Sequence, residues 1–232
     1  MIVYGRNAVR EALRGPRDVA RVWATARAAD EPWLADAALP VSVEDAEALV
    51  RRCGSEEHQG VCAEVAAYEY ADADALLAAE APVIVALDEV QDPQNLGAIC
   101  RSAECAGATG VVVPRHRAAD VTPAVCKASA GAVEHLPVAQ VRNLADFLAD
   151  AKRAGCWVYG AQAGADTAYD EPDYSGGVVC VLGAEGRGLR PRVAGACDTL
   201  VSLPLRGRIE SLNVGATAAV LLYEILQRRA AA

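Results

Sequence analysis

Apolar residues in the second part of the chain gather in short continuous runs, which alternate with segments of helical spacing. Such runs predict strands at residues 83–88, 110–113, 136–141, 157–161, 178–182 and 199–203. Helices are predicted over residues 95–106, 122–129, 144–154 and 213–229. Strands that are apolar throughout and separated by helices indicate a parallel sheet covered on both faces. The expected fold class is therefore α/β.

The beginning of the chain carries a smaller α/β pattern. Helical spacing at residues 6–14 is followed by strand-like runs at 19–25 and 61–65. Ser42 is the expected N-cap of a helix that continues through residue 52. Residues 69–82 are acidic, rich in alanine and end in proline, which is typical of a connector and compatible with a short helix. We therefore expect a small domain at 1–68, a linker at 69–82 and a larger domain at 83–232.

Composition excludes several classes of protein. The hydrophobic content of 53% is ample for a core, and no run reaches the roughly 18 uncharged apolar residues of a membrane helix. The first residues lack the regions of a signal peptide, so we expect a cytoplasmic protein. The 8 cysteines form no C-x-x-C pair, and there are 3 histidines. A structural zinc site needs closely paired ligands, so we expect buried free thiols and no metal.

The charge of the chain gives two opposing indications. A formal net charge of −9 argues against a polyanion-binding protein, because phosphate contacts supply most nucleic-acid affinity. All but two of the 22 basic residues are nevertheless arginines, whose planar fork suits phosphate groups and base edges. A GC-rich genome explains this arginine content equally well. The arginines are also concentrated: Arg115 and Arg117 follow a predicted strand, and the sequence in and around 181–189 and 203–214 carries Arg187, Arg190, Arg192, Arg206 and Arg208.

The glycine-rich segment at residues 183–188 (GAEGRG) follows an apolar strand, as nucleotide-binding loops do. Its glycines stand in the wrong order for the dinucleotide fingerprint G-x-G-x-x-G, and the chain has no P-loop. An NAD-type oxidoreductase is therefore disfavoured. The glycines on both sides of Glu185 still leave backbone amides and carbonyls open to a ligand.

Three segments, in this order along the chain, carry a family resemblance: 92–102 (DPQNLGAICRS), 181–189 (VLGAEGRGL) and 203–214 (LPLRGRIESLNV). Together they resemble the signatures of the SpoU, or TrmH-type, RNA ribose methyltransferases of the SPOUT superfamily. Residues 4–13 (YGRNAVREAL) and 58–61 (HQGV) resemble the ribosomal protein L30e-like domain that precedes many SpoU catalytic domains. Residues 127–132 (KASAGA) with Glu134 also resemble the family.

The resemblance implies a fold, a cofactor and a set of site residues. It implies a C-terminal trefoil knot, which general topology rules would disfavour. It also implies S-adenosylmethionine as cofactor and a homodimer, because active sites of the family need the partner subunit. Cofactor contacts, mainly through backbone groups, are implied for Gly183, Leu203 and Leu212. The implied catalytic group is Arg101, which Asn95 and Glu185 would jointly hold, with Ser211 and Asn213 at the ribose or the cofactor. The apolar face expected at the dimer interface comprises Val214, Ala218, Leu221, Leu222 and Ile225.

The residue types leave other roles open. Asn95 opens the predicted helix and Arg101 lies about 9 Å further along its axis, so Asn95 fits a simple cap. Arg101 fits a phosphate ligand, because an arginine pKa above about 12 makes a literal general base awkward. Glu185 fits a structural support of its loop, and Ser211 fits a helix cap with Asn213 as its partner. His58 fits a loop or RNA-contact residue better than a ligand.

The function implied by the resemblance is S-adenosylmethionine-dependent methylation of a ribose 2′-hydroxyl in RNA. The two-domain form and the segments 58–61 and 127–132 look most like enzymes that methylate a guanosine of large-subunit (23S) ribosomal RNA. A tRNA ribose methyltransferase and a resistance enzyme acting on ribosomal adenosine are alternatives within the family. A non-catalytic RNA-binding factor of ribosome assembly is the alternative from another class, and fold alone would not separate these.

Overall fold

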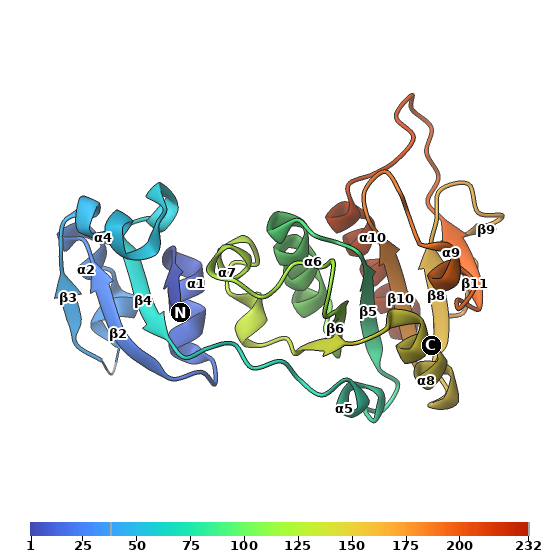
Figure 1. The fold of residues 1–232 in the computed structure, drawn as a ribbon, viewed down its shortest axis with the longest axis horizontal. Helices are drawn as coiled ribbons and strands as arrows, with labels where there is room; N and C mark the ends of the chain where they lie inside the picture. The colour runs from blue at the N-terminus through green and yellow to red at the C-terminus, as the bar shows by residue number, and fades with distance from the viewer. Residues whose placement is uncertain (38, 232) are drawn as a thin grey trace.

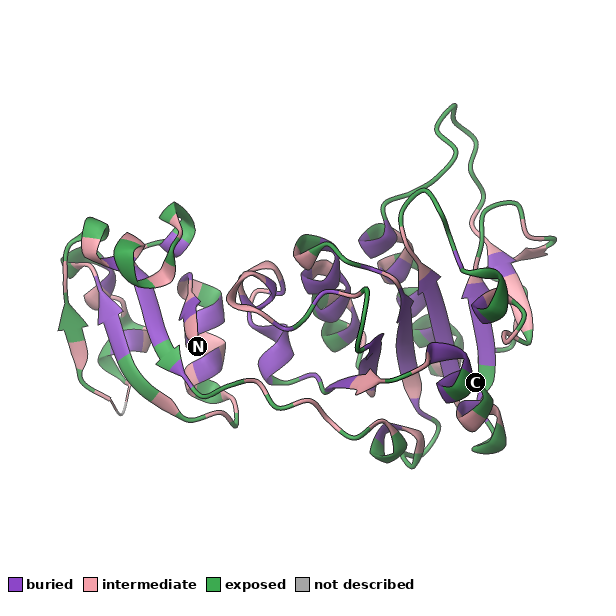
Figure 2. Cartoon of the chain, in the orientation of Figure 1, coloured by how far each residue is buried: buried purple, intermediate pink, exposed green. Residues whose placement is uncertain are grey.

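The computed structural model describes residues 1–37 and 39–231, which form two α/β units joined by an extended connector (Figure 1). None of the helices in these ranges combines the length and apolar composition needed to span a bilayer. Most strands are largely buried, whereas the edge strand Val41–Val43 of the first unit and most loops are partly or fully exposed (Figure 2). The two units correspond to the two α/β patterns of the sequence, which lie on either side of the acidic segment 69–82.

The small unit is a four-stranded sheet with helices packed on it. Its strands, β1 (Ile2–Tyr4), β2 (Val19–Ala24), β3 (Val41–Val43) and β4 (Val61–Val65), lie in the order β1-β4-β2-β3. Its helices are α1 (Arg6–Arg14), α2 (Ala26–Ala29), α3 (Pro32–Ala35), α4 (Ala46–Cys53) and the 3-10 turn η1 (Glu56–His58). The expected cap at Ser42 is wrong, because Ser42 lies in β3. Asp45 caps α4 instead, accepting a 2.7 Å hydrogen bond from the Ala48 amide.

The larger unit is built on a seven-stranded sheet in the order β7-β6-β5-β10-β8-β11-β9, with every pair parallel. The strands are β5 (Val83–Asp88), β6 (Gly110–Pro114), β7 (Val138–Val141), β8 (Trp157–Ala161), β9 (Thr167–Ala168), β10 (Val178–Gly183) and β11 (Thr199–Ser202). The helices are α6 (Pro93–Cys105), α7 (Pro123–Ala128), η2 (Ala132–Glu134), α8 (Leu144–Arg153), α9 (Pro191–Ala194) and α10 (Val214–Ala231). The short elements β9 and α9 are not expected from the sequence.

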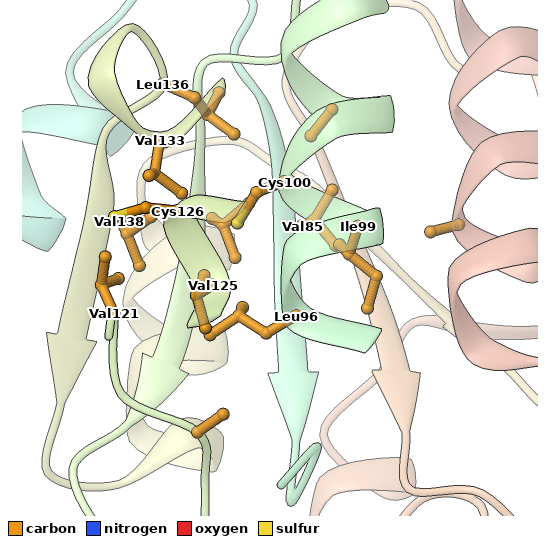
Figure 3. Close-up of a cluster of buried hydrophobic side chains, with 14 of the residues drawn as sticks. Val85, Leu96, Ile99, Cys100, Val121, Val125, Cys126, Val133, Leu136 and Val138 are labelled. Carbon is orange, nitrogen blue, oxygen red and sulfur yellow. The ribbon is translucent and has the colours of Figure 1, made fainter. Parts of the chain in front are cut away.

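Side chains alternate between the two faces of this sheet and fill a separate core on each. Val85 and Leu87 of β5 pack with α6, α7 and α10, whereas Ile84 and Ala86 pack with α8 and α9. The sheet is therefore covered on both faces, as its apolar strands predicted. Figure 3 shows the first core, in which Leu96, Ile99 and Cys100 of α6 lie between β5 and α7.

The close approach of α6 and α7 depends on Gly97, a residue of the first family-like segment. A Cβ at this position would lie 2.4 Å from the Cβ of Ala128 and 2.8 Å from the backbone nitrogen of Ser129. No side chain fits in that space, so glycine is required here for helix packing. Because α6 carries Asn95 and Arg101, the close packing of α6 against α7 also fixes the backbone positions of these two residues.

The connector is packed onto the larger sheet along its length. Its helix α5 (Ala73–Leu77) buries Leu76 in the second core. Ala71 donates a 2.9 Å backbone hydrogen bond to Val138, at the edge strand β7. These contacts hold the chain that joins the two units against one of them.

The two units also contact each other directly, through the segment that contains α7 and η2. Arg17 follows α1 and forms an ion pair with the buried carboxylate of Glu134, whose side chain is 0% exposed. On the other side of the contact, Lys127 donates a 2.8 Å hydrogen bond to the carbonyl of Glu57. His135 lies 3.0 Å from the carboxylate of Glu11 in α1. The segment 127–135 therefore docks the small unit onto the larger one.

We expect Arg17→Met to lower the free energy of unfolding by about 3 kcal/mol, because removal of one partner leaves the buried Glu134 charge uncompensated. The side chain of Arg17 is only 9% exposed, so water reaches the pair poorly. Urea unfolding of the purified variant measures the change. Arg14→Met is the matched control, since Arg14 is 61% exposed and pairs with Glu11 at the surface. Equal destabilisation in both variants would contradict a special role of the buried pair.

The expectation of buried thiols is confirmed for most of the cysteines. The buried ones are Cys62, Cys100, Cys126, Cys156 and Cys180, whereas Cys105 at the end of α6 is exposed. Burial raises the pKa of Cys100 and of Cys180 to about 12, so neither holds an appreciable thiolate fraction near neutral pH.

We therefore expect a thiol reagent at pH 8 to modify Cys105 first and the partly exposed Cys53 and Cys197 more slowly. The buried thiols should react only when the protein unfolds. Mass spectrometry of peptides after timed labelling identifies the modified residues. Fast labelling of Cys180 in the native protein would contradict the packing described for β10.

Candidate functional site

A cavity of the larger unit, with a volume of about 400 Å³, lies at the carboxyl ends of β8, β10 and β11. In parallel sheets this edge is where ligands bind, and the volume falls within the range of small-molecule sites. It is lined by the ends of the three strands, the loops after them and the first turn of α10: Ala161, Gln162, Ala163, residues 182–188, Val201, Leu203, Leu205, residues 210–212, Val214 and Thr217. The second and third family-like segments therefore meet in one cavity.

The glycine-rich wall of the cavity is folded tightly back on itself. Gly183 ends β10, and a Cβ there would lie 2.2 Å from the carbonyl carbon of Gly188. The amide of Gly188 donates a 2.9 Å hydrogen bond to the carbonyl of Ala184, and Gly186 and Gly188 have φ of 76° and 64°. Only glycine adopts this geometry without strain, and the absence of side chains leaves the backbone facing the cavity.

Three predicted residues from distant parts of the chain form a hydrogen-bonded cluster beside the cavity. The side-chain amide of Asn213 donates to the Asn95 side-chain oxygen at 2.8 Å and to Oε1 of Glu185 at 2.6 Å. Nδ2 of Asn95 donates to the same Glu185 oxygen at 3.2 Å. We call these residues the Asn95–Glu185–Asn213 cluster. The cluster ties α6, the glycine-rich loop and the start of α10 together.

Helix caps near the site differ from the expected ones. Asp92 caps α6, accepting a 3.0 Å hydrogen bond from the Gln94 amide, so Asn95 lies within the helix and is buried. At α10 the cap is Asn213, whose Oδ1 accepts from the Gly215 amide at 2.9 Å. The interpretations of Asn95 and Ser211 as caps are therefore wrong. Ser211 is exposed and lines the cavity, where it is open to a ligand.

Arg101 lies apart from this cluster. It is exposed on α6, and no hydrogen bond or ion pair joins its guanidinium to another residue within 1–37 and 39–231. The expectation that Asn95 and Glu185 jointly hold Arg101 is not reflected in these contacts, because both side chains bond to Asn213 instead. Arg101 is thus left accessible to a second molecule.

Sequence reasoning missed a charged pair at the centre of the same sheet edge. Asp88 ends β5 with no exposed surface and accepts hydrogen bonds from the backbone nitrogen of Arg190 at 2.8 Å and from its Nε at 2.7 Å. The hydrogen bond with Asp88 raises the pKa of Arg190. The signal in the sequence was an acid closing a wholly apolar strand. This pair anchors the chain that leaves the glycine-rich loop.

Polar residues that were not singled out also line the cavity, notably Gln162 after β8 and Thr217 in the first turn of α10. In the small unit, Nδ1 of His58 accepts from the Gly60 amide at 2.9 Å, and Oε1 of Gln59 accepts from the Arg6 amide at 3.0 Å. The HQGV segment therefore shapes the loop before β4. Within the residues that the structure describes, no group of three or more potential ligands is arranged to hold a metal ion.

Two family models match the chain. The SpoU rRNA methylase family matches residues 82–223, and the domain described as RNA 2′-O ribose methyltransferase substrate binding matches residues 2–71. The first contains the cavity and the Asn95–Glu185–Asn213 cluster. The second contains the four-stranded sheet of the small unit.

Individual proteins are similar over nearly the whole chain. A Bacillus subtilis protein, provisionally named the TrmH family tRNA/rRNA methyltransferase YacO, is 37% identical over 98% of this chain and 95% of its own length. A Mycobacterium ulcerans protein, named a tRNA/rRNA methyltransferase but itself uncharacterised, is 42% identical over 98% of this chain and 77% of its own length. The crystal structure of the SpoU methyltransferase AviRb from Streptomyces viridochromogenes, in complex with AdoMet, gives a TM-score of 0.84. It is 25% identical and covers 99% of this chain and 90% of that chain.

Proposed function

The chain belongs to the SpoU rRNA methylase family, and on that basis we propose that it methylates the ribose 2′-hydroxyl of a guanosine in large-subunit (23S) ribosomal RNA. Members of this family are S-adenosylmethionine-dependent RNA methyltransferases, and ribose 2′-O-methylation is the family activity. The observation that carries the proposal is the Asn95–Glu185–Asn213 cluster at a cavity built from two of the three family-like segments.

The cavity fits S-adenosylmethionine in size and in the nature of its walls. Its volume of about 400 Å³ is adequate for a nucleoside with an amino-acid tail, and small residues such as Ala161 and Gly183 leave backbone groups accessible. Gly183, Leu203 and Leu212 are the residues we propose to hold the cofactor. When bound, S-adenosylmethionine supplies an activated methyl group on a sulfonium centre.

The residues around the cavity orient the ribose and assist loss of its proton. Methyl transfer would form a bond from the 2′-oxygen to the methyl carbon and break the methyl–sulfur bond, releasing the thioether S-adenosylhomocysteine, and the hydroxyl proton would pass to a base or to water. Orientation can supply roughly 7–11 kcal/mol of such a barrier, so a rigid site matters most. The Asn95–Glu185–Asn213 cluster provides that rigidity, and Ser211 lies where it can hydrogen-bond the ribose or the cofactor. Arg101 is the proposed catalytic residue, as a phosphate-assisted base or as an electrostatic organiser.

The division of labour follows the two units. We assign recognition of the RNA to residues 1–68 and the chemistry to residues 83–232, joined by the connector at 69–82. The match of residues 2–71 to a substrate-binding domain supports this assignment. The buried Arg17–Glu134 pair holds the two parts in a defined relation, so that RNA bound by one is presented to the other.

A tRNA substrate is the second candidate, because the B. subtilis and M. ulcerans relatives are both named as tRNA/rRNA methyltransferases. A ribosomal adenosine would use the same chemistry. Mapping of 2′-O-methyl groups in ribosomal and transfer RNA, from cells with and without this protein, separates these possibilities. Loss of one guanosine modification in large-subunit RNA supports the proposal. Unchanged modification in every RNA would favour a non-catalytic factor of ribosome assembly.

The proposal includes a homodimer, but through a different helix face from the one expected. Val214, Ala218, Leu221, Leu222 and Ile225 are all buried within the chain, where they pack with α6 and β10. The large apolar residues left exposed on α10 are Val220, Tyr223 and Leu226, with exposures of 39%, 50% and 43%. This exposed stripe is the proposed contact with a second copy. The trefoil knot and the cytoplasmic location stay predictions.

We expect sedimentation at micromolar concentration to give a dimer, and Tyr223→Glu with Leu226→Glu to give a monomer without methyl transfer. Burying two carboxylates in an apolar contact is too costly to be tolerated. Ala149→Glu is the control, because it adds a charge of the same sign at an exposed position of α8, which covers the opposite face of the sheet from α10. A wild-type monomer with full activity would contradict the proposal.

A further inference from the structure

A second cavity lies at the carboxyl edge of the larger sheet, away from the proposed cofactor cavity. Its volume is about 270 Å³, and it opens between the ends of β6 and β7, the start of α8 and the chain around α9. Half of its lining residues carry basic side chains: His116, Arg117, Arg142, Arg190 and Arg192. We call it the arginine cavity. No residue of the three family-like segments lines it.

The arginines of this cavity are presented to solvent. Arg117, Arg190 and Arg192 have side-chain exposures of 73%, 43% and 72%, and Arg142 is also exposed. The buried carboxylate of Asp88 holds Arg190 in place by accepting a 2.7 Å hydrogen bond from its Nε. The cavity therefore has one cation fixed by a buried carboxylate and three further guanidinium groups that are exposed.

Acidic neighbours neutralise this charge only in part. Glu89 lies 3.3 Å from Arg117 and 3.4 Å from Arg190, and Asp146 lies 3.0 Å from Arg192. Together with Asp88, three carboxylates face four guanidinium groups, and Arg142 has no ion pair within the described ranges. A local excess of positive charge in a chain with a net charge of −9 marks this place as a site for an anion.

The strand order shows where the arginine cavity lies relative to the cofactor cavity. The strand order places β7 and β6 at one end of the sheet and β10, β8 and β11 toward the other. The arginine cavity and the cofactor cavity thus lie on the same edge, separated by β5 and its buried Asp88. The segment between β6 and β7, residues 115–137, also carries the contact with the small unit. An RNA that reaches from the small unit to the cofactor cavity along this edge passes the arginine cavity.

We propose that the arginine cavity binds phosphate groups of the substrate RNA backbone, next to the nucleotide whose ribose lies in the cofactor cavity. This inference rests on the proposed function. The chemistry favours phosphate, because guanidinium groups bind two phosphate oxygens at once through their fork of donors. Such contacts position RNA in the site without reading its sequence.

The test uses Arg142→Gln combined with Arg192→Gln in the full chain, which removes two exposed cations and leaves the Asp88–Arg190 pair intact. Filter binding of transcribed large-subunit ribosomal RNA and of tRNA is measured over a range of salt concentrations. Removal of each arginine–phosphate interaction should lower the slope of log affinity against log salt by roughly 0.7–0.9. We expect about tenfold weaker RNA binding at moderate salt and unchanged affinity for S-adenosylmethionine.

Arg153→Gln is the matched control. Arg153 is 73% exposed and pairs with Asp150, much as Arg192 is 72% exposed and pairs with Asp146, but it lies at the far end of α8. The substitution should leave both RNA affinity and salt slope unchanged. If Arg153→Gln lowered the affinity for RNA as much as the double variant does, the loss would reflect the overall charge of the protein. The proposed phosphate site would then be overturned.

The outcomes separate this inference from the proposed function. Wild-type affinity and salt slope in the double variant, together with normal methyl transfer by the wild type, overturn the arginine cavity alone. Weakened RNA binding in the double variant, together with no transfer by the wild type to any RNA, supports the cavity and overturns the proposed activity. If the wild type binds neither RNA, both are overturned.

Discussion

Gly183→Ala should abolish binding of S-adenosylmethionine and, with it, methyl transfer. The added Cβ would lie 2.2 Å from the carbonyl carbon of Gly188 and 2.5 Å from the Leu189 nitrogen, and both are backbone atoms. Neither can move without opening the Ala184–Gly188 hydrogen bond that shapes the cavity wall. We expect affinity in calorimetry to fall by more than about a hundredfold.

Gly207→Ala is the control for this prediction. Gly207 belongs to the third family-like segment, has no positive φ, and a Cβ there would meet nothing within 4 Å. The cofactor affinity of this variant should stay within about twofold of the wild type. Thermal unfolding and far-UV circular dichroism show whether Gly183→Ala remains folded. A folded Gly183→Ala protein that binds the cofactor with wild-type affinity would refute the placement of the cofactor in this cavity.

The strands of the larger unit are the most predictable part of the fold. The sequence predicts strands at 83–88 and 157–161 with the bounds that the structure has, because a central parallel strand is buried on both faces and must be apolar throughout. Short elements such as β9 and α9 have too few residues to show a hydrophobic periodicity in the sequence. Their formation depends on neighbours elsewhere in the sequence, here β11 for β9.

Helix caps are the least predictable local feature. Ser42, Asn95 and Ser211 are all good capping residues by type, yet Asp45, Asp92 and Asn213 are the caps. Several capping residues stand close together at each helix start, and tertiary contacts decide between them. The Asn95 side chain, for example, is engaged by Glu185, 90 residues away, rather than by the end of α6.

The sequence predicts which residues form the candidate site but not which of them hydrogen-bond to one another. The family resemblance supplies Asn95, Glu185 and Asn213 as separate positions, and the structure joins them in one cluster. The Asp88–Arg190 pair spans 102 residues, so the local pattern marks Asp88, an acid that closes an apolar strand, but does not identify its partner. Pairings of this kind follow from the strand order, in which β5 and β10 are neighbours although four other strands lie between them along the chain.

Arg101→Ala should reduce methyl transfer by a factor of about 10²–10³ or more while cofactor affinity stays nearly unchanged. Arg101 is not among the residues that line the cofactor cavity, so its removal leaves that cavity as it is. Loss of an interaction made only in the transition state lowers turnover without weakening ground-state binding of another ligand. Calorimetry gives the cofactor affinity, and tritium transfer to transcribed ribosomal RNA gives the rate.

Asn213→Ala provides the contrast, because the Asn213 side chain both caps α10 and holds Glu185 at 2.6 Å. This variant should weaken cofactor binding and transfer together, whereas Arg101→Ala should affect transfer alone. Arg101→Lys keeps the charge but removes the planar fork, so partial activity in that variant would indicate an electrostatic organiser. Wild-type transfer by Arg101→Ala would show that the catalytic group has been assigned to the wrong residue. The reaction would then depend on Ser211 and on the Asn95–Glu185–Asn213 cluster.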